Sequence, residues 1–387
     1  MSGRLDAAAI REVQVEDLLR RSPVVIDEPA LRDLIGGQTV LVTGAGGSIG
    51  SELARQVYDL DPRALVLLDR AEGPLYDIDR ELALLAERDS GTLARAGHHR
   101  AELATRLANV ASPEPMRRII ARDRPVMVLH AAAYKHVPMM EHHPADAVYT
   151  NIGGTLAALR ASIAGDVERF VLVSTDKAVE PSSVMGATKR LAELAVAAVA
   201  RESGRRYVSV RFGNVLGSSG SVVPLFQRQL REGVPLTITD PDMTRYFMTI
   251  PEASRLILQA SLFGLPGDLF VLDMGEPIRI VDLARDLARL AGRDPDSVPI
   301  RYIGLRPGEK LHESLFYSVE SIEPTAHPKV MRARGTATTP EGLLEHLDEL
   351  VEIGASGDHA LARERLFHTL RQFAPDDGAS VAATHGA

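Results

Sequence analysis

A glycine-rich run gives the clearest chemical signal in this sequence. It reads Thr43-Gly44-Ala45-Gly46-Gly47-Ser48-Ile49-Gly50, directly after an apolar run and directly before the helical-looking segment Ser51–Tyr58. Gly44 allows a tight turn, Gly47 lets backbone amides approach a pyrophosphate, and Gly50 permits close packing of helix on strand. The amino end of the helix adds a positive field. The pattern predicts a dinucleotide site, with a plain glycine turn as the alternative.

A carboxylate follows the glycines at a distance typical of nucleotide-binding folds. Asp69 ends a second apolar run, nineteen residues after Gly50, where it could accept hydrogen bonds from an adenosine ribose. Its charge would repel a 2′-phosphate, whereas the neighbouring Arg70 could attract one. We therefore expect NAD as the cofactor in preference to NADP. The alternative for Arg70 is a solvated loop charge.

Three consecutive polar residues could carry acid–base chemistry. Thr175, Asp176 and Lys177 follow the apolar run Phe170–Ser174, and α/β sheets place their ligands beyond the carboxyl ends of the strands. An ordinary lysine is protonated at neutral pH, so Lys177 needs desolvation or nearby positive charge to act as a base. The alternative is a strand-end turn that holds an ion pair.

Short β-rich runs separated by helix-length spacers must position these residues. Most are apolar on both faces, as in parallel strands buried on both sides. The runs are Thr39–Thr43, Leu65–Asp69, Val126–His130, Phe170–Ser174, Tyr207–Phe212 and Leu269–Leu272. The best-marked helix runs from about Gly186 to Arg201, where apolar residues recur at helical spacing. These features predict an α/β fold, a Rossmann-type doubly wound parallel sheet with a smaller C-terminal substrate-binding region.

Composition divides the chain into segments. A Gly- and Ser-rich loop and several prolines follow Asn214, and large apolar residues almost vanish beyond Pro375. We expect an N-terminal helical segment at 1–36, a NAD-binding domain at 37–213, a substrate-binding region with some returning sheet elements at 214–335, a C-terminal helical segment at 336–373 and a disordered tail at 374–387.

Overall composition excludes several classes of protein. The chain has 387 residues, a formal charge of -8 and no cysteine, so disulfides, thiolate nucleophiles and Cys-ligated metals are ruled out. Mild acidity argues against a nucleic-acid partner. The longest apolar stretch is far shorter than the roughly 18 residues that a spanning helix requires, and no secretory signal is visible. We expect no membrane span in this chain and a cytoplasmic location.

Several motifs together resemble the extended short-chain dehydrogenase/reductase superfamily, and within it the nucleotide-sugar 4,6-dehydratases of polysaccharide biosynthesis. The similarity is strongest to the UDP-N-acetylglucosamine 4,6-dehydratase branch and covers about Arg11 to Lys329. The motifs are the glycine run, His130-Ala131-Ala132-Ala133-Tyr134-Lys135-His136-Val137-Pro138, Ser174-Thr175-Asp176-Lys177-Ala178-Val179, Val184-Met185-Gly186-Ala187-Thr188-Lys189 and Leu305-Arg306-Pro307-Gly308-Glu309-Lys310.

The resemblance implies a reaction without net redox change. Hydride passes from sugar C4 to NAD, the C5 proton and the C6 hydroxyl are lost, and hydride returns to C6, so the cofactor can remain bound. Lys177 would be the C5 base, Asp176 the acid that protonates the departing hydroxyl, and Thr175 a hydrogen-bonding partner of the C4 oxygen. The reverse assignment of Asp176 and Lys177 stays open.

One position departs from the superfamily pattern. Met185 stands where the YxxxK motif has its tyrosine, four residues before Lys189, and a thioether cannot transfer a proton. Lys189 can still hold the nicotinamide ribose from the same helix face. Methionine here is a feature of the branch thought to retain configuration at C5, so we expect retention. The alternative makes Met185 a core residue and Lys189 a surface charge.

The glycine run and the resemblance together supply contact residues. For the cofactor these are Gly44, Gly47, Ser48, Ile49, Gly50, Asp69, Arg70, Asn109, Val110, Ala131, Ala132, Ala133, Asn151, Ser174 and Lys189. For the nucleotide sugar they are Lys135, His136, Asn214, Val215, Ser218, Val222, Arg245, Arg306 and Glu309. Arginine suits a diphosphate because its fork donates two hydrogen bonds.

Two further details qualify this picture. The family usually presents Gly-Asp-Val beside the adenine, whereas this chain has Ala108-Asn109-Val110, which puts cofactor affinity in doubt. We expect no metal, because His136, His142 and His143 lack a third ligand in a recognisable arrangement.

Two other functions remain open. One is a C5-inverting dehydratase or an epimerase acting on another nucleotide sugar, and the other is a non-enzymatic NAD-bound scaffold. Met185 disfavours a tyrosine-dependent epimerase, and an intact Thr175-Asp176-Lys177 disfavours a scaffold. Related proteins often form dimers or rings, so we expect a homo-oligomer. Larger relatives carry a membrane portion before a segment like 11–19, so the sequence looks like the catalytic half alone.

Overall fold

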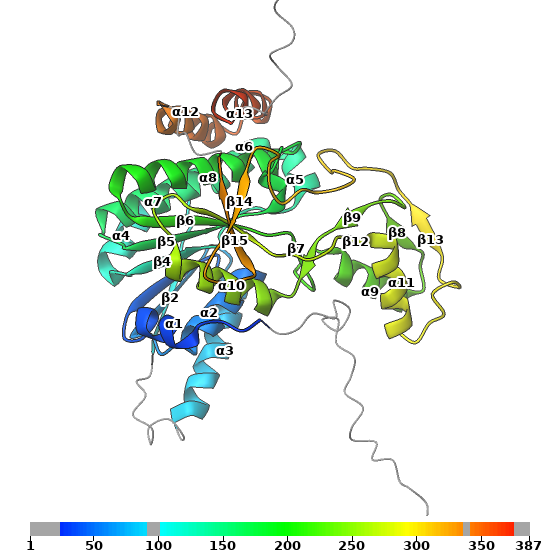
Figure 1. Ribbon diagram of the computed structural model, residues 1–387, viewed down its shortest axis with the longest axis horizontal. Coiled ribbons are helices and arrows are strands. Elements are labelled where there is room, and N and C mark those ends of the chain that lie inside the picture. The colour runs from blue at the N-terminus through cyan, green and yellow to red at the C-terminus, as the bar shows by residue number, and fades with distance from the viewer. Residues whose placement is uncertain (1–23, 91–100, 336–340, 375–387) are drawn as a thin grey trace, which may run out of the picture.

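The computed structural model describes residues 24–90, 101–335 and 341–374 (Figure 1). Within these ranges the expected N-terminal helical segment is represented by helix α1 (Glu28–Ile35), which begins where the Asp27 side chain accepts a hydrogen bond from the Ala30 amide. The expected disordered tail lies outside the described residues, apart from Ala374.

The described part of the chain builds one central sheet of nine strands. Their spatial order is β14-β15-β11-β6-β5-β4-β1-β2-β3, and the seven strands from β11 to β3 pair in parallel, while β15 and β14 add an antiparallel edge. The strands are β1 (Thr39–Thr43), β2 (Ala64–Asp69), β3 (Glu102–Leu107), β4 (Met127–His130), β5 (Arg169–Val173), β6 (Arg206–Arg211), β11 (Leu269–Leu272), β14 (Ser321–Pro324) and β15 (Val330–Arg334). The predicted Rossmann-type α/β fold is confirmed.

All six predicted strands are present, with ends that differ by at most one residue. Their side chains alternate between two cores: Leu41 of β1 packs on one face of the sheet, and Val40 and Val42 on the other. The sequence did not reveal β3, an edge strand whose residues are mostly exposed or half-buried. It lacks the two-sided apolar pattern that marks the inner strands.

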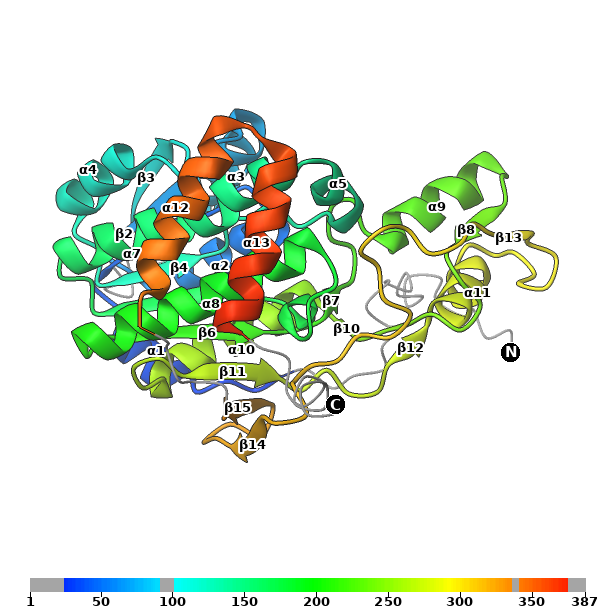
Figure 2. The ribbon, with the colours of Figure 1, turned by 90° about the horizontal axis from the view of Figure 1, so that it is seen from above.

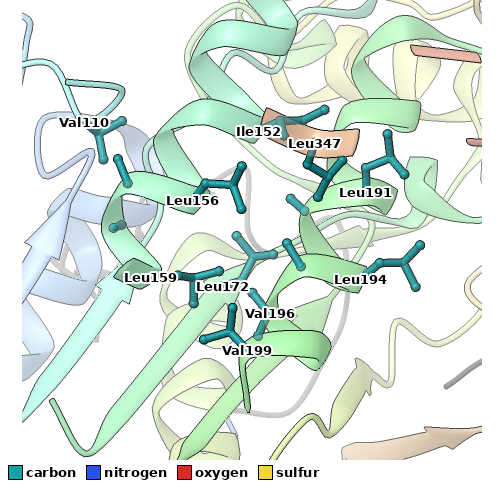
Figure 3. Close-up of a cluster of buried hydrophobic side chains, with 14 of the residues drawn as sticks. Val110, Ile152, Leu156, Leu159, Leu172, Leu191, Leu194, Val196, Val199 and Leu347 are labelled. Atoms are coloured by element: carbon teal, nitrogen blue, oxygen red, sulfur yellow. The ribbon is translucent and has the colours of Figure 1, made fainter. Parts of the chain in front are cut away.

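Helices cover both faces of the sheet (Figure 1). One core contains residues of α1, α2 (Ser48–Tyr58), α3 (Glu72–Ser90) and α10 (Ile250–Phe263). The opposite core contains residues of α4 (Pro113–Asp123), α5 (Val137–His142), α6 (Pro144–Ala147), the π-helical turn η4 (Val148–Gly153), α7 (Gly154–Ala164) and α8 (Val184–Ser203). Figure 3 shows how leucines and valines of α7 and α8 meet Leu347 over the sheet.

Helix α8 begins two residues earlier than the sequence pattern predicts. The hydroxyl oxygen of Ser183 accepts a hydrogen bond from the Gly186 amide and so caps the helix. This cap precedes the apolar periodicity from which the helix was inferred. Ser183 and Met185 therefore sit in the turn that faces the strand ends.

A C-terminal helix pair covers α7 and α8. It consists of α12 (Leu343–Ser356) and α13 (His359–Phe373), which lie across that side of the molecule (Figure 2). Leu347 and Leu366 are fully buried in the shared core. Among the helices of the described ranges, none combines the length and apolarity that a membrane crossing demands.

A smaller lobe stands beside the sheet (Figure 1). Its own apolar core is formed mainly by α9 (Val222–Glu232), β8 (Leu236–Ile238) and α11 (Ile280–Leu290), and β13 (Ile300–Tyr302) pairs with β8. Two short ladders join it to the larger part. They pair β7 (Asn214–Val215) with β10 (Phe247–Met248), and β9 (Thr244–Arg245) with β12 (Ile278–Arg279).

Candidate active site

The glycine run forms the turn between β1 and α2. Gly44 has a φ of +69°, a conformation that favours glycine, and a Cβ on Gly50 would lie 1.9 Å from the Gly44 carbonyl oxygen. No described side chain caps the amino end of α2, which starts at Ser48. Its first amides are therefore available to an anion, and the site residues present fit a pyrophosphate.

Asp69 stands at the carboxyl end of β2 and shapes this turn. One carboxylate oxygen accepts a hydrogen bond from the Gly46 amide at 3.0 Å, and the other accepts from the Ala71 amide at 2.9 Å. The Arg70 guanidinium lies over the Tyr134 ring, 4.4 Å from its centre, and donates to the Tyr134 hydroxyl. Arg70 is thus engaged by an aromatic residue that sequence reasoning did not single out.

A cavity of about 670 Å³ extends from the glycine turn to the smaller lobe. Most of the predicted site residues line it. They are Gly44, Gly47, Ser48, Ile49, Gly50, Ala131, Ala133, Lys135, His136, Ser174, Thr175, Lys177, Met185, Lys189, Asn214, Val215, Ser218, Val222, Arg245, Arg306 and Glu309. Seven predicted site residues are not among the lining residues: Asp69, Arg70, Asn109, Val110, Ala132, Asn151 and Asp176.

The three consecutive polar residues form one hydrogen-bonded unit after β5. Asp176 is fully buried, and its Oδ1 accepts from the Thr175 hydroxyl and from Lys177 Nζ, both at 2.9 Å. Lys177 Nζ also donates to Asn214 Oδ1 at 3.0 Å. These two contacts hold the Lys177 amine between Asp176 and Asn214. Asp176 Oδ2 is buried without a hydrogen-bond partner in the described part of the protein.

Helix α8 brings Met185 and Lys189 against this unit. A Cβ on Gly186 would lie 2.2 Å from the Lys177 carbonyl oxygen, so the close approach requires glycine. Both Met185 and Lys189 are buried, which corrects the alternative that made Lys189 a surface charge. Burial lowers the pKa of Lys189 to about 8, against the opposing charge of Glu193. This lysine is therefore close to losing its proton at neutral pH.

Three of the predicted cofactor residues use their side chains in hydrogen bonds to other groups of the protein. The Asn151 side chain accepts from the Tyr134 amide and donates to the Tyr134 carbonyl, so it fixes the segment before Lys135. Asn109 Oδ1 accepts from the Ala111 amide. Ser174 donates its hydroxyl proton to Glu193 at 2.6 Å.

The arginines of the substrate side are also engaged. Arg245 donates to the backbone carbonyls of Thr244, Lys310 and Leu311 at 2.7 to 3.0 Å. Arg306 pairs with Glu309 at 2.5 Å, and its side chain is half exposed. Arg245 thus anchors the segment that carries Arg306, and only Arg306 projects toward solvent.

The fold adds one buried carboxyl group that the sequence did not single out. Glu313 lines the cavity and lies 3.8 Å from Arg245, measured between Oε1 and Nη2. Its position three residues after Lys310, at the end of the Arg306-to-Lys310 motif, was the available signal. Its burial could not be foreseen, because the elements that bury it are distant in sequence.

The fold places two further possible metal ligands, Asp146 and His359, beside His143. Ligand-capable atoms of His143, Asp146 and His359 lie within 4.8 Å of one another. All three residues are exposed, and the amino ends of α6 and α13 meet there. The positive field of helix amino ends disfavours a cation, so this cluster does not change the expectation of a metal-free reaction.

The fold and the cavity define a class of protein. A dinucleotide-type glycine turn and a Thr-Asp-Lys unit at the carboxyl edge of one Rossmann-type sheet, facing a smaller lobe, place it in the extended short-chain dehydrogenase/reductase class that contains nucleotide-sugar dehydratases and epimerases. Residues 40–335 match the family described as "Polysaccharide biosynthesis protein", and the chain belongs to this family.

Individual proteins agree with this assignment. The chain is 45% identical over 335 residues to the capsular polysaccharide biosynthesis protein CapD of Staphylococcus aureus, covering 86% of this chain and 54% of CapD. It thus spans about half the length of that relative. The structure of Pen from Bacillus thuringiensis is 29% identical, with a TM-score of 0.68, and the match covers 78% of this chain and 89% of Pen.

A more distant structure shares the fold. The dTDP-glucose 4,6-dehydratase DesIV of Streptomyces venezuelae, solved as a double mutant with NAD bound, is 23% identical with a TM-score of 0.60. The match covers 71% of this chain and 87% of DesIV.

Proposed function

We propose that the protein catalyses the NAD-dependent 4,6-dehydration of UDP-N-acetylglucosamine. The product would be the 4-keto-6-deoxy sugar nucleotide, UDP-2-acetamido-2,6-dideoxy-xylo-hexos-4-ulose, with the configuration at C5 retained. The observation that carries the proposal is that the glycine turn and the Thr175, Lys177, Met185 and Lys189 side chains line one cavity. Cofactor and sugar would therefore meet over the polar unit.

The fit of the cofactor supports this proposal. The uncapped amino end of α2 would hold the pyrophosphate, Asp69 the adenosine ribose, and Lys189 the nicotinamide ribose. NAD is proposed in preference to NADP because Asp69 carries a negative charge and Arg70 is engaged with Tyr134. Bound NAD would take up hydride from sugar C4 and return it to C6.

The polar unit would handle the protons. Thr175 would bind the C4 oxygen, and Lys177 would remove the C5 proton. A lysine acts as a base only after it has given up its ammonium proton. Lys177 donates to both Asp176 and Asn214, and displacement of one acceptor by the substrate would free its amine for this role. For the donor to the departing C6 oxygen, the family resemblance points to Asp176.

Met185 supports retention. Its thioether leaves no phenol at this position of α8, so residue 185 cannot exchange protons with C4 or reprotonate C5 from a second direction. With one base on one side, the proton returns to C5 on the side from which it left. We propose 37–213 as the cofactor domain and 214–335 as the region that binds the nucleotide sugar.

The first experiment is to incubate the purified protein with UDP-N-acetylglucosamine in deuterated water without added NAD. We expect a product lighter by one water, apart from isotopic substitution, with one solvent deuterium at C5 and gluco-like configuration by NMR. Mass spectrometry of the nucleotide released on denaturation identifies NAD or NADP. A product of unchanged mass except for deuterium would indicate an epimerase, and inverted C5 an inverting dehydratase. Unchanged substrate, even with both cofactors added, would contradict the proposal.

A further inference from the structure

We propose that Glu313 is the proton donor to the oxygen that leaves C6, in the role that the family resemblance gives to Asp176. This inference rests on the proposed dehydration. Glu313 lines the cavity together with Thr175 and Lys177, whereas Asp176 is fully buried behind them and is not among the lining residues.

The contacts of Asp176 already give it another task. Its Oδ1 accepts from both Thr175 and Lys177, so it fixes the hydroxyl and the amine of the polar unit. The arrangement makes Asp176 a positioning residue that holds the two side chains facing the sugar.

The Glu313 carboxyl group is not committed in this way. Its Oε2, like Asp176 Oδ2, is buried without a hydrogen-bond partner in the described part of the protein, but only Glu313 lines the cavity. Arg245 is 3.8 Å from Oε1, beyond hydrogen-bonding distance, and donates instead to backbone carbonyls. Burial without a hydrogen-bonded cation favours the neutral, protonated form of a carboxyl group.

Burial outweighs the surrounding charges in setting the pKa of Glu313. Burial is the largest influence and raises the pKa of Glu313, and the negative charge of Asp176 raises it further. The charges of Lys177, Arg245 and Lys310 oppose this without reversing it. Glu313 therefore retains its proton to higher pH than an ordinary glutamate.

The proposed step balances. After oxidation at C4, the base removes the C5 proton and the C5–H electron pair forms the C5=C6 double bond. The C6–O bond breaks, its electron pair takes the Glu313 proton, and water leaves while Glu313 becomes a carboxylate. Over one turnover the proton lost by the C4 hydroxyl balances the one that Glu313 gives.

The test compares Glu313→Gln and Glu313→Asp with the wild type. Glutamine keeps the size and polarity of the side chain but cannot deliver an acid proton, whereas aspartate keeps the proton. With UDP-N-acetylglucosamine in deuterated water we expect Glu313→Gln to slow water loss by about 10²-fold or more, while deuterium still enters C5 of recovered substrate. Glu313→Asp should restore part of the rate. Glu323→Gln, in the exposed ion pair with Arg334, is the control.

A merely structural role predicts a different pattern. Exchange at C5 and water loss would then fall together, and aspartate would give no rescue, which would overturn the proposal. Water loss within a few fold of wild type in Glu313→Gln would also overturn it. The wild-type rate should fall as pH rises through the pKa of Glu313, and the residual rate of Glu313→Gln should lack this decline.

A second measurement does not depend on the substrate. Infrared difference spectra between wild type and Glu313→Gln at neutral pH should contain a protonated carboxyl band, which disappears in the wild type at alkaline pH. Its absence would overturn the proposal even if the wild type is an active dehydratase. If the wild type does not dehydrate the sugar nucleotide, the proposed function fails and with it the proposed proton delivery, whereas the infrared band still shows whether Glu313 is protonated.

Discussion

At the scale of single residues, the polar unit after β5 is organised around Asp176. Its carboxylate holds Thr175 and Lys177 at 2.9 Å each, and Lys177 reaches Asn214 on the far side. Adjacent residues along one strand end could have pointed apart. The short helical turn that begins at Asp176, capped by Thr175, instead gathers them.

The base role of Lys177 leads to a first prediction. Lys177→Met removes the only group proposed to take the C5 proton, so solvent exchange at C5 should fall by about 10²- to 10⁴-fold. NMR of recovered substrate in deuterated water measures this. A Lys177→Met variant that still exchanges, beside an Asp176→Asn variant that does not, would make Asp176 the C5 base.

Lys189 supports a second prediction, on stability. Its folded pKa of about 8 lies below the ordinary lysine value of 10.5, so between these values the unfolded chain binds more protons than the folded protein. Stability from this group therefore rises with pH across that window and is lowest below pH 8. Lys189→Met should raise the free energy of unfolding at pH 7 by up to about 3 kcal/mol, seen as unfolding at a higher urea concentration. The variant should also lose activity. A less stable variant would show that the buried ammonium has stabilising partners.

At the scale of elements, Glu141 of α5 connects three helices. Its side chain is 5% exposed, one oxygen accepts from the Val184 amide at the start of α8 at 2.6 Å, and the other accepts from Arg363 of α13 at 2.5 Å. The negative charge also suits a helix amino end. The C-terminal helix pair is thereby tied to the turn that carries Met185.

This arrangement gives a third prediction. Glu141→Ala leaves a buried amide of α8 without its acceptor and should destabilise the protein by about 1–3 kcal/mol. Arg363→Met should cost less, about 0–1 kcal/mol, because this arginine is half exposed. Urea unfolding of both variants and the double variant measures the coupling. Equal losses in the single variants would show that the contact with α13, not the helix amide, dominates.

At the scale of the whole molecule, a buried ionic network joins sheet, helix and C-terminal strands. The fully buried Arg211 of β6 donates to Glu193 of α8 at 2.7 and 2.8 Å and to Glu320, just before β14, at 3.0 Å. Burial alone would raise the pKa of Glu193, but Arg211, Arg190 and Ser174 together lower it.

The network gives a fourth prediction. A lowered Glu193 pKa means that its stabilisation is present above the unfolded value of about 4.3 and is lost as pH falls through the folded pKa. Arg211→Met removes the buried cation that Glu193 and Glu320 share, leaving Glu193 with Arg190 and Ser174 and Glu320 with the Tyr317 amide. It should destabilise the protein by about 3–5 kcal/mol at pH 7. Unfolding at several pH values should show this difference shrinking below pH 4. A difference that does not depend on pH would indicate lost packing instead.

The sequence by itself determined the sheet and the glycine turn. Inner parallel strands are apolar on both faces, and a turn that passes close to a helix requires glycine at Gly44 and Gly50, so both leave local patterns. Most residues inferred from motifs also line the cavity, because motifs at strand ends meet at one edge of a parallel sheet.

Only the tertiary structure decided which side chains remain available for chemistry. Asp176 became an internal acceptor, Arg245 an anchor for backbone carbonyls, and Glu313 a carboxyl group buried in the cavity wall. The positions of the outer strands β3, β14 and β15 likewise appeared only in the fold, because few of their residues are buried and they lack the two-sided apolar pattern. Burial and pairing are set by contacts between residues far apart along the chain, and a local pattern does not encode such contacts.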